Sequence, residues 1–284
     1  MKFDFTGKKV IITGGSMGLG FETAKYFVSN GADIIICSRN INELEEAAKK
    51  LSDEKINQSQ SIKFLKIDVA NTNEIDSLFE YSGMPDILVT CAGIYGPIGK
   101  LEDNSWDEWE YTVRVNLIGT VYCVRKVISI WKNQNRGGKI ICLSGGGATK
   151  GMPNFSSYAA TKSAVVRTVE TLALENIDSG IYINAVAPGA LNTRMLDQAL
   201  NAGGESTGAE TYKKLLQQKE NGGASIKNAA ELIGYLASDI SDGITGKLIS
   251  AVWDDWKNFH ENKNLFAHPE IFTLRRITPD LIKE

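Results

Sequence analysis

The chain has 284 residues, 43% of them hydrophobic and 23% charged, with a formal net charge of −3 and a pI near 5.6. Such a chain can bury a full core, and it offers no basic field for a nucleic-acid backbone. No apolar run reaches bilayer length, and the first ten residues carry an acid and no apolar stretch. We therefore expect neither a membrane span nor a secretory signal, and a cytoplasmic protein.

The cysteines all lie in apolar segments and show no CxxC spacing, which favours buried, reduced thiols. They are Cys37, Cys91, Cys123 and Cys142. The two histidines, His260 and His268, both stand near the C-terminus, so a histidine-built metal site or triad has almost nothing to be built from.

Short β-branched apolar runs alternate with segments of helical spacing. Strands are expected at 8–13, 32–38, 62–68, 86–90, 139–144, 181–187 and 247–253, and helices at 18–29, 41–51, 73–81, about 105–132, 156–177 and 226–238. Strands that are apolar throughout are typical of a sheet buried on both faces. The alternation predicts one domain over 1–252, a doubly wound parallel sheet in three α/β/α layers, followed by an extension at 253–284.

One compositional shift interrupts this pattern at 201–225, where NAGGESTG and NGGAS flank a short polar helix. A glycine-bounded stretch of this kind predicts a mobile flap, spanning about 190–225, over a site. The alternative is a surface excursion.

The segment TGGSMGLG, residues 13–20, follows the first strand and opens the first helix. Its glycines allow a tight turn and a close approach of a pyrophosphate to the helix N-terminus, as in a Rossmann fold. We expect the turn to bind a dinucleotide through Gly14, Ser16, Met17, Gly18, Leu19 and Gly20. The alternative is a tight turn that serves packing only.

The second strand ends without a carboxylate, because Ser38 and then Arg39 stand where an acid would bind the adenosine ribose. A guanidinium suits a phosphate, and no carboxylate is present to repel one. The expected cofactor is NADP rather than NAD.

Together with later motifs, this turn resembles the short-chain dehydrogenase/reductase family, in its single-domain branch, from about residue 5 to about 252. The motifs stand in the family's order: TGGSMGLG (13–20), DV (68–69), CAG (91–93), VNLIGT (115–120), SYAATK (157–162) and PGALNT (188–193). The resemblance implies a small-molecule substrate and a homodimer or homotetramer.

The resemblance also implies cofactor contacts beyond the glycine turn. Asp68 would accept a hydrogen bond from the adenine amino group and Val69 would lie along the ring, unless Asp68 instead caps the following helix. The ribose side would be lined by Cys91, Ala92 and Gly93, although the family usually has asparagine where Thr90 or Cys91 stands. The nicotinamide carboxamide would be held by Pro188, Gly189 and Thr193.

Tyr158 and Lys162 are four residues apart and lie on one helix face. A free tyrosine titrates near pH 10, and an ammonium about 4 Å away favours the phenolate by about 4 kcal/mol at an effective dielectric near 20. We therefore expect Lys162 to lower the Tyr158 pKa and make Tyr158 an acid/base group. The alternative is a packing ring and a solvated lysine.

By the resemblance, Lys162 would also hold the nicotinamide ribose, and Asn116 would anchor a water in a proton relay. An asparagine in a helix can instead simply bend it. The family hydroxyl that polarises the substrate carbonyl falls, without a gap, on Gly145. Ser144 serves only if the loop holds one extra residue; otherwise a backbone N–H of the glycine run or the Thr149 hydroxyl would take its place.

The extension at 253–284 mixes polar residues with Trp253, Trp256, Phe259, Phe266 and Phe272. It is expected to pack on its own or a neighbouring subunit; the alternative is an aromatic wall of the substrate pocket, with Asp254 or Asp255 binding substrate hydroxyls. The stretch beside the pocket is rich in Asn, Thr and Gly, which favours a sugar or polyol derivative.

The sequence thus predicts an NADP-dependent oxidoreductase acting on a carbonyl or secondary alcohol, with Tyr158, Lys162, Asn116 and Ser144 as its catalytic residues. Two alternatives stay open. One is a cofactor-binding regulatory protein without turnover, and the other is a lyase or epimerase that uses transient oxidation.

Overall fold

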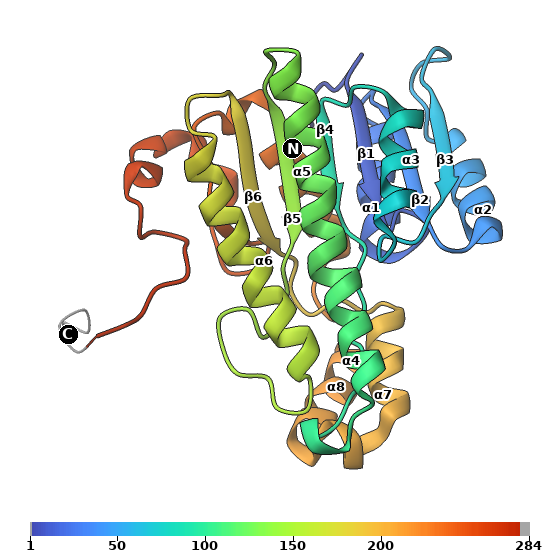
Figure 1. Cartoon of the computed structure of the whole chain (residues 1–284), viewed down its shortest axis with the longest axis vertical. Coiled ribbons are helices and arrows are strands. Elements are labelled where there is room, and N and C mark those ends of the chain that lie inside the picture. Colours follow the sequence, from blue (N-terminus) through green and yellow to red (C-terminus); the bar gives the residue numbers. More distant parts are fainter. Residues whose placement is uncertain (1, 279–284) are drawn as a thin grey trace.

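The computed structural model describes residues 2–278, and within that range seven strands form one sheet, in the order β3-β2-β1-β4-β5-β6-β7 (Figure 1). All neighbouring strands are parallel. The strands are β1 Lys9–Thr13, β2 Asp33–Ser38, β3 Ile62–Lys66, β4 Ile87–Thr90, β5 Gly138–Leu143, β6 Ile181–Ala187 and β7 Leu248–Ser250. The strand order reverses between β1 and β4, and ligands of such sheets bind outside the carboxyl ends of the strands at this point.

Helices cover both faces of the sheet. Strand residues share one buried cluster with α1, α2 and α9, and the other with α3, α5 and α6. The helices are α1 Gly18–Val28, α2 Ile41–Ser52, α3 Thr72–Ser82, α4 Trp106–Val113, α5 Thr120–Asn133, α6 Ser156–Glu175, α7 Arg194–Thr207, α8 Ala209–Asn221 and α9 Ile226–Ala237. These three layers confirm the predicted doubly wound α/β/α fold.

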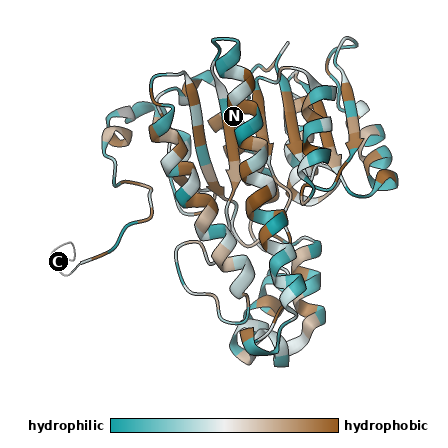
Figure 2. Cartoon of the chain, viewed as in Figure 1, coloured by the Kyte–Doolittle hydropathy of each residue, from teal (hydrophilic) through white to brown (hydrophobic). Residues whose placement is uncertain are grey.

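The two clusters explain why the strands are apolar throughout. In β1, Val10 and Ile12 belong to the cluster of α1 and α9, while Ile11 belongs to the cluster of α3 and α5, and all three side chains are fully buried. Figure 2 shows this concentration of apolar residues along the strands. Polar side chains that bind a ligand can therefore lie only beyond the ends of the strands. No helix within residues 2–278 has both the length and the apolar composition needed to cross a membrane.

The helix predicted at about 105–132 is interrupted. Between α4 and α5 the chain makes a π-helical turn over Arg114–Gly119. A Cβ built on Gly119 would lie 2.5 Å from the Val69 carbonyl oxygen, so the glycine lets this turn touch the loop after β3. Wide turns of this kind often occur at functional sites, and this one carries Asn116.

The predicted flap contains two helices, α7 and α8, where the sequence suggested one. Gly203 inside α7 has a non-helical φ of 78°, and Gly208 between the helices has a φ of 84°. These left-handed positions break the helical period, which is why the pattern was missed. In Figure 1 both helices lie at the lower end of the molecule, beside α4.

The C-terminal extension packs against the domain over its described part, residues 253–278. Trp256, Phe259 and Phe266 join the same buried cluster as α9, and the Trp256 ring lies 5.8 Å from that of Tyr235. The Phe272 carbonyl accepts a hydrogen bond of 2.7 Å from Leu248 N at the edge strand β7. These contacts join residues 256–272 to the domain of their own chain, the role of the extension stays a prediction, and 279–284 lie outside the described residues.

The pocket-wall alternative for the extension finds no support in the contacts of its acids. Asp254 accepts a hydrogen bond from Ser250 N at 2.7 Å, and Asp255 accepts one from the Asn258 side chain at 2.9 Å. Trp253 is 86% exposed.

Candidate active site

The glycine turn after β1 has the geometry of an anion site. Gly14 and Gly18 have φ of 68° and 54°, and a Cβ built on Gly20 would lie 2.1 Å from the Gly14 carbonyl oxygen, so no larger residue fits there. Met17, which precedes α1, offers no side-chain cap, and the first turn of α1 contains no acid. The free N–H groups and the positive end of the helix dipole are therefore left for a ligand phosphate, and the residues fit the expected dinucleotide.

Two later segments reach this turn. A Cβ on Gly14 would lie 2.8 Å from Ala92 N, and one on Gly18 would lie 3.6 Å from the Thr193 side chain. Ala92 N donates to the Thr13 hydroxyl at 3.2 Å. The structure thus brings the ends of β1, β4 and β6 together around the predicted cradle.

Other predicted cofactor residues follow the same carboxyl edge. Val69 is buried against Gly119, and Cys91 N donates to Thr13 O at 3.2 Å. Gly189 has a φ of 89°, and a Cβ there would lie 2.6 Å from the Val252 side chain. Gly189, next to Pro188, therefore serves at least to pack the loop after β6 against the end of β7.

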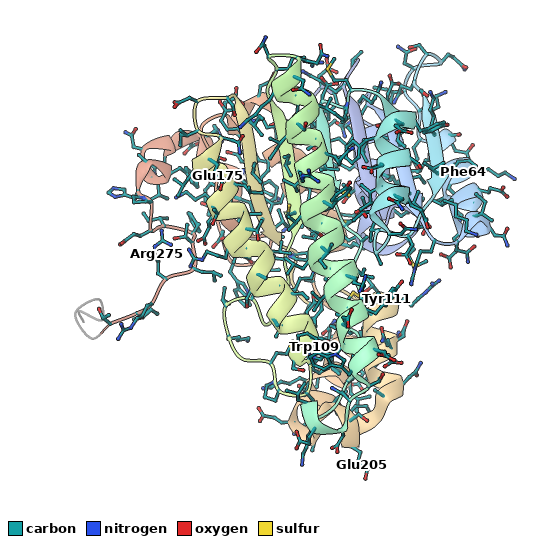
Figure 3. All side chains as sticks on the ribbon, viewed as in Figure 1. Phe64, Trp109, Tyr111, Glu175, Glu205 and Arg275 are labelled. Carbon is teal, nitrogen blue, oxygen red and sulfur yellow. The ribbon has the colours of Figure 1, made fainter. Side chains whose placement is uncertain are left out.

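Arg39 and Asp68 are joined by Tyr111, a residue of α4 that the sequence analysis missed. Arg39 donates to the Tyr111 hydroxyl at 2.8 Å, and this hydroxyl donates to Asp68 Oδ2, also at 2.8 Å. Figure 3 labels Tyr111 on α4, which leads into Asn116. The one feature of the sequence that could have indicated Tyr111 is its place five residues before Asn116, in the helix that leads to the carboxyl ends of the strands.

Asp68 does not cap α3, which was the alternative for it, because Asn71 is the N-cap and its side chain accepts a hydrogen bond from Asn73 N. The second contact of Asp68 lies in the loop before this cap. Asp68 Oδ1 accepts a hydrogen bond from Ala70 N at 2.9 Å, just before α3. Among the described residues, the Ser38 hydroxyl donates one long hydrogen bond, of 3.5 Å, to Asn40 O. The second strand therefore ends in a guanidinium whose hydrogen-bond partner is a phenol.

Tyr158 lies on α6 with only 8% of its surface exposed. Its ring packs edge-to-face on that of Tyr95, with centroids 4.8 Å apart. Burial raises the pKa of Tyr158, and the neighbouring Tyr95 phenol raises it further. Since a buried phenolate loses its hydration, Tyr158 keeps its proton at neutral pH.

Lys162 is also buried, with 5% exposed, and donates a hydrogen bond of 2.8 Å to the Leu143 carbonyl at the end of β5. Burial lowers its pKa from 10.5 to about 8. Its Nζ lies 5.7 Å from the centre of the Tyr158 ring. The alternative of a solvated lysine is therefore excluded.

The expectation that Lys162 lowers the Tyr158 pKa is wrong for the chain alone. The expected attraction assumed a charged contact at about 4 Å in a polarisable medium. Here the ammonium is bound to a main-chain carbonyl, and the cost of burying the phenolate decides the direction of the shift.

Asn116 is fully buried and makes three hydrogen bonds. Its Oδ1 accepts from Ile94 N at 2.9 Å, and its Nδ2 donates to Ile94 O at 2.8 Å and to the Thr161 hydroxyl at 3.1 Å. Thr161 in turn donates to Tyr158 O at 2.8 Å. Asn116 therefore ties the loop after β4 to the helix of Tyr158, in addition to lying in the π-helical turn.

The serine and the glycine after β5 occupy different environments. The Ser144 hydroxyl is buried and has no hydrogen-bond partner among the described residues, Tyr158 included. A Cβ built on Gly145 would lie 2.2 Å from the Tyr158 hydroxyl. The residue directly beside this hydroxyl is therefore Gly145, and it carries no side chain. Thr149 is exposed.

A hydrophobic cluster surrounds Tyr158, and its members come from four segments far apart in the chain. They are Tyr95, Ile98, Met152, Phe155, Met195, Ala199 and Leu215. Met195 and Ala199 belong to α7 and Leu215 to α8, so the flap helices do pack over Tyr158. The cluster places bulky apolar side chains beside Tyr158, whereas the sequence drew attention to a stretch rich in Asn, Thr and Gly.

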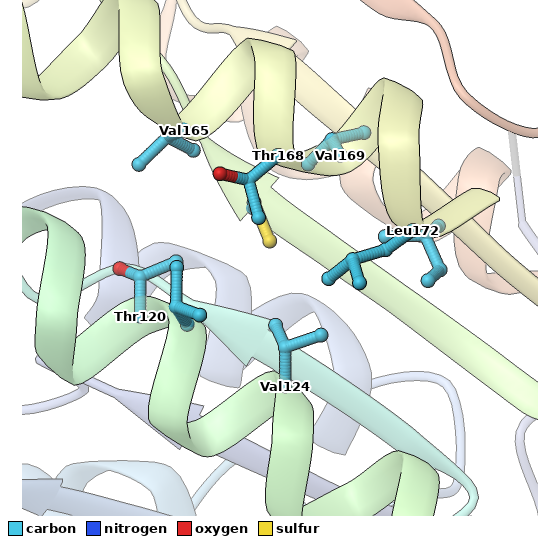
Figure 4. Close-up of a pocket in the computed structure, with 9 residues that line it drawn as sticks. Thr120, Val124, Val165, Thr168, Val169 and Leu172 are labelled. Atoms are coloured by element: carbon cyan, nitrogen blue, oxygen red, sulfur yellow. The ribbon is translucent and has the colours of Figure 1, made fainter. Parts of the chain in front are cut away.

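A separate apolar cavity lies between α5 and α6 (Figure 4). Thr120, Val124, Val165, Thr168 and Leu172 are among its lining residues. Because none of the predicted site residues lines it, this cavity has no part in the candidate chemistry.

The buried ammonium of Lys162 should give the folded chain a characteristic pH dependence. The folded chain loses this proton near pH 8 and the unfolded chain near 10.5, so stability should rise between these values, by about 3 kcal/mol in all. Urea unfolding of the wild type and of Lys162→Met at pH 7 and pH 10 measures this. From pH 7 to pH 10, the free energy of unfolding of the wild type should rise relative to that of Lys162→Met. The wild type should show no such rise relative to Lys49→Met, a variant at an exposed site. A difference independent of pH contradicts the prediction.

Comparison with known proteins agrees with the fold and the edge on which the site lies. The family model described as short chain dehydrogenase matches residues 8–203. A 3beta-hydroxysteroid dehydrogenase of Eggerthella lenta is 32% identical over 86% of this chain and 91% of its own length, and a versicolorin reductase of Emericella nidulans is 31% identical over 86% and 93%.

Among solved structures, the L-sorbose reductase of Gluconobacter frateurii, complexed with NADPH and L-sorbose, superposes with a TM-score of 0.76 at 25% identity, covering 88% of this chain and 97% of that one. The family match covers most of the chain, and both curated relatives extend along nearly its whole folded length. The chain therefore belongs to the short-chain dehydrogenase/reductase family of NAD(P)-dependent oxidoreductases.

Proposed function

We propose that this oxidoreductase is an NADP-dependent reductase of an apolar ketone, with Tyr158 as the proton donor. The observation that carries the proposal is the buried pair of Tyr158 and Lys162, which stands at the carboxyl edge of the sheet where the glycine turn also opens. A protonated phenol beside a buried cation suits the reduction of a carbonyl.

Each of the three residues Tyr158, Lys162 and Asn116 would have a distinct role in this reaction. When bound, the reduced nicotinamide supplies the hydride that the carbonyl carbon accepts. Tyr158 donates its proton to the carbonyl oxygen, and Lys162 holds the nicotinamide ribose. Asn116 positions both neighbouring segments through its bonds to Ile94 and Thr161.

The choice of NADP is supported by Arg39. Arg39 follows β2, which ends in Ser38 and not in an acid, and its guanidinium donates to the Tyr111 hydroxyl, which in turn donates to Asp68. A planar cation in this place favours a ribose phosphate. The L-sorbose reductase was solved with NADPH, which agrees with this choice without deciding it for this chain.

The substrate class is where the proposal departs from the sugar or polyol expected from the sequence. Compared relatives include both a hydroxysteroid dehydrogenase and an L-sorbose reductase, so family membership does not choose between these classes. The apolar side chains packed around Tyr158, such as Met152, Phe155 and Met195, favour an apolar carbonyl compound. Burying sugar hydroxyls against them would leave polar groups without partners.

The proposal is tested by following NADPH absorbance with 1-tetralone, cyclohexanone and L-sorbose. The wild type should reduce 1-tetralone with the highest kcat/KM, and Tyr158→Phe should abolish turnover because no group replaces the proton donor. Tyr122→Phe, which removes a hydroxyl bonded to Asp76 on the α5 side, is the matched control and should stay active. Preference for L-sorbose would overturn the substrate class, and an active Tyr158→Phe would overturn the mechanism.

Ser144→Ala should keep turnover within a few-fold of the wild type. The Ser144 hydroxyl is buried and has no hydrogen-bond partner in residues 2–278, so its removal should also leave the thermal midpoint unchanged or higher. Steady-state kinetics and a melting curve measure both effects. A loss on the order of 10² in kcat would instead show that this hydroxyl supports the developing oxyanion.

Arg39→Ala should weaken NADPH binding at least about tenfold, the effect of losing a charge-assisted contact of about 1.4 kcal/mol, and should leave NADH binding nearly unchanged. Titration of cofactor fluorescence measures both constants. Arg136→Ala is the control, because Arg136 pairs with Asp86 before the amino ends of β5 and β4, away from the carboxyl ends where Arg39 lies. An equal loss for both cofactors would contradict phosphate recognition by Arg39.

A cofactor-binding regulatory protein without turnover is the second candidate, and the bare Gly145 beside the Tyr158 hydroxyl favours it. Saturable NADPH binding without any change in absorbance across the ketone panel would support this function. The cytoplasmic location and the homodimeric or homotetrameric state stay predictions.

A further inference from the structure

Tyr95, in the loop after β4, places a second phenol against the proposed proton donor. Its ring lies edge-to-face on Tyr158, at 4.8 Å, and on Phe155, at 5.2 Å. No described residue forms a hydrogen bond with the Tyr95 hydroxyl, and the residue is only partly buried. Burial raises its pKa, so it stays a hydrogen-bond donor at neutral pH.

The loop holds Tyr95 firmly in this place. Asn116 bonds both N and O of the preceding Ile94, and the Ser157 hydroxyl donates to Tyr95 O at 3.3 Å. Gly96 has a φ of 73°, and a Cβ there would lie 1.9 Å from the Thr112 hydroxyl, so the chain can turn after Tyr95 only at glycine. With its main chain fixed by these bonds and its ring packed on Tyr158 and Phe155, Tyr95 loses little freedom when it binds a ligand.

A carbonyl oxygen that gains negative charge during reduction is stabilised by two donors, and Tyr158 is one of them. The other hydroxyls nearby are committed elsewhere or badly placed. Ser157 and Thr161 donate to main-chain carbonyls, and the buried Ser144 hydroxyl forms no hydrogen bond with any described residue, Tyr158 included. Gly145, which touches Tyr158, has no side chain to offer.

We propose that the Tyr95 hydroxyl is the second hydrogen-bond donor to the substrate carbonyl oxygen, opposite Tyr158. This inference rests on the proposed reductase function and adds a catalytic residue to it. The pair of phenols replaces the single serine hydroxyl that the resemblance led us to seek after β5.

Tyr95→Phe tests the proposal because it removes the hydroxyl and keeps the ring that packs on Tyr158 and Phe155. With 1-tetralone, kcat should fall by about 10²-fold while KM changes little, since the contact strengthens in the transition state. Tyr122→Phe should leave kcat unchanged. If Tyr158→Phe is inactive but Tyr95→Phe keeps kcat within twofold of the wild type, the inference is overturned and the proposed function stands.

A second measurement does not depend on turnover. NADP⁺ cannot reduce 1-tetralone, so the bound ketone can be observed in its presence. The C=O stretching frequency of the bound ketone should be lower than in a dry apolar solvent, because two hydrogen-bond donors weaken the C=O bond. The band should shift back upward in Tyr95→Phe and remain at the wild-type position in Tyr122→Phe. An unshifted band in Tyr95→Phe refutes the role of Tyr95, whereas the absence of any saturable bound band refutes the apolar substrate class and, with it, this inference.

Discussion

The candidate site depends on one buried amide, the side chain of Asn116. Its three hydrogen bonds reach the loop after β4, through Ile94, and the helix α6, through Thr161. Because the Thr161 hydroxyl also donates a hydrogen bond to Tyr158 O, the Asn116 amide fixes the position of Tyr158 relative to that loop. A buried amide with satisfied donors is costly to disturb, so it holds these segments in one arrangement.

Burial, rather than charge attraction, governs the titration of the site. Both Tyr158 and Lys162 are pushed toward their neutral forms, the phenol by a raised pKa and the ammonium by a lowered one. The Leu143 carbonyl compensates part of the cost of the buried cation. Burial therefore disfavours the phenolate form of Tyr158. A phenol that keeps its proton suits the reduction of a carbonyl better than the removal of a proton from an alcohol.

Gly145, which follows β5, and the apolar cluster both lie against Tyr158. Gly145 lets the Tyr158 hydroxyl approach the main chain where a side chain would collide with it. Tyr95 and flap residues such as Met195 and Leu215 pack against the cluster that contains the Tyr158 ring. In the proposed function, such a site recognises its ligand by shape and apolar contact.

Local patterns in the sequence were sufficient for the fold and for the parts of the site that follow strand ends. Apolar runs and helical spacing depend on neighbouring residues, so the parallel sheet, the glycine turn and the Tyr158–Lys162 pair on α6 could all be predicted. The two flap helices were missed because Gly203 and Gly208 interrupt their period.

Only the tertiary structure decided what surrounds these residues. Tyr95, Tyr111 and Met195 are far from Tyr158 or Arg39 in the chain, and no local period marks them as neighbours. The direction of the Tyr158 pKa shift likewise depends on how completely these distant side chains exclude water. Sequence spacing determines which residues share a helix face, whereas burial and the partners of a charge arise from packing between segments.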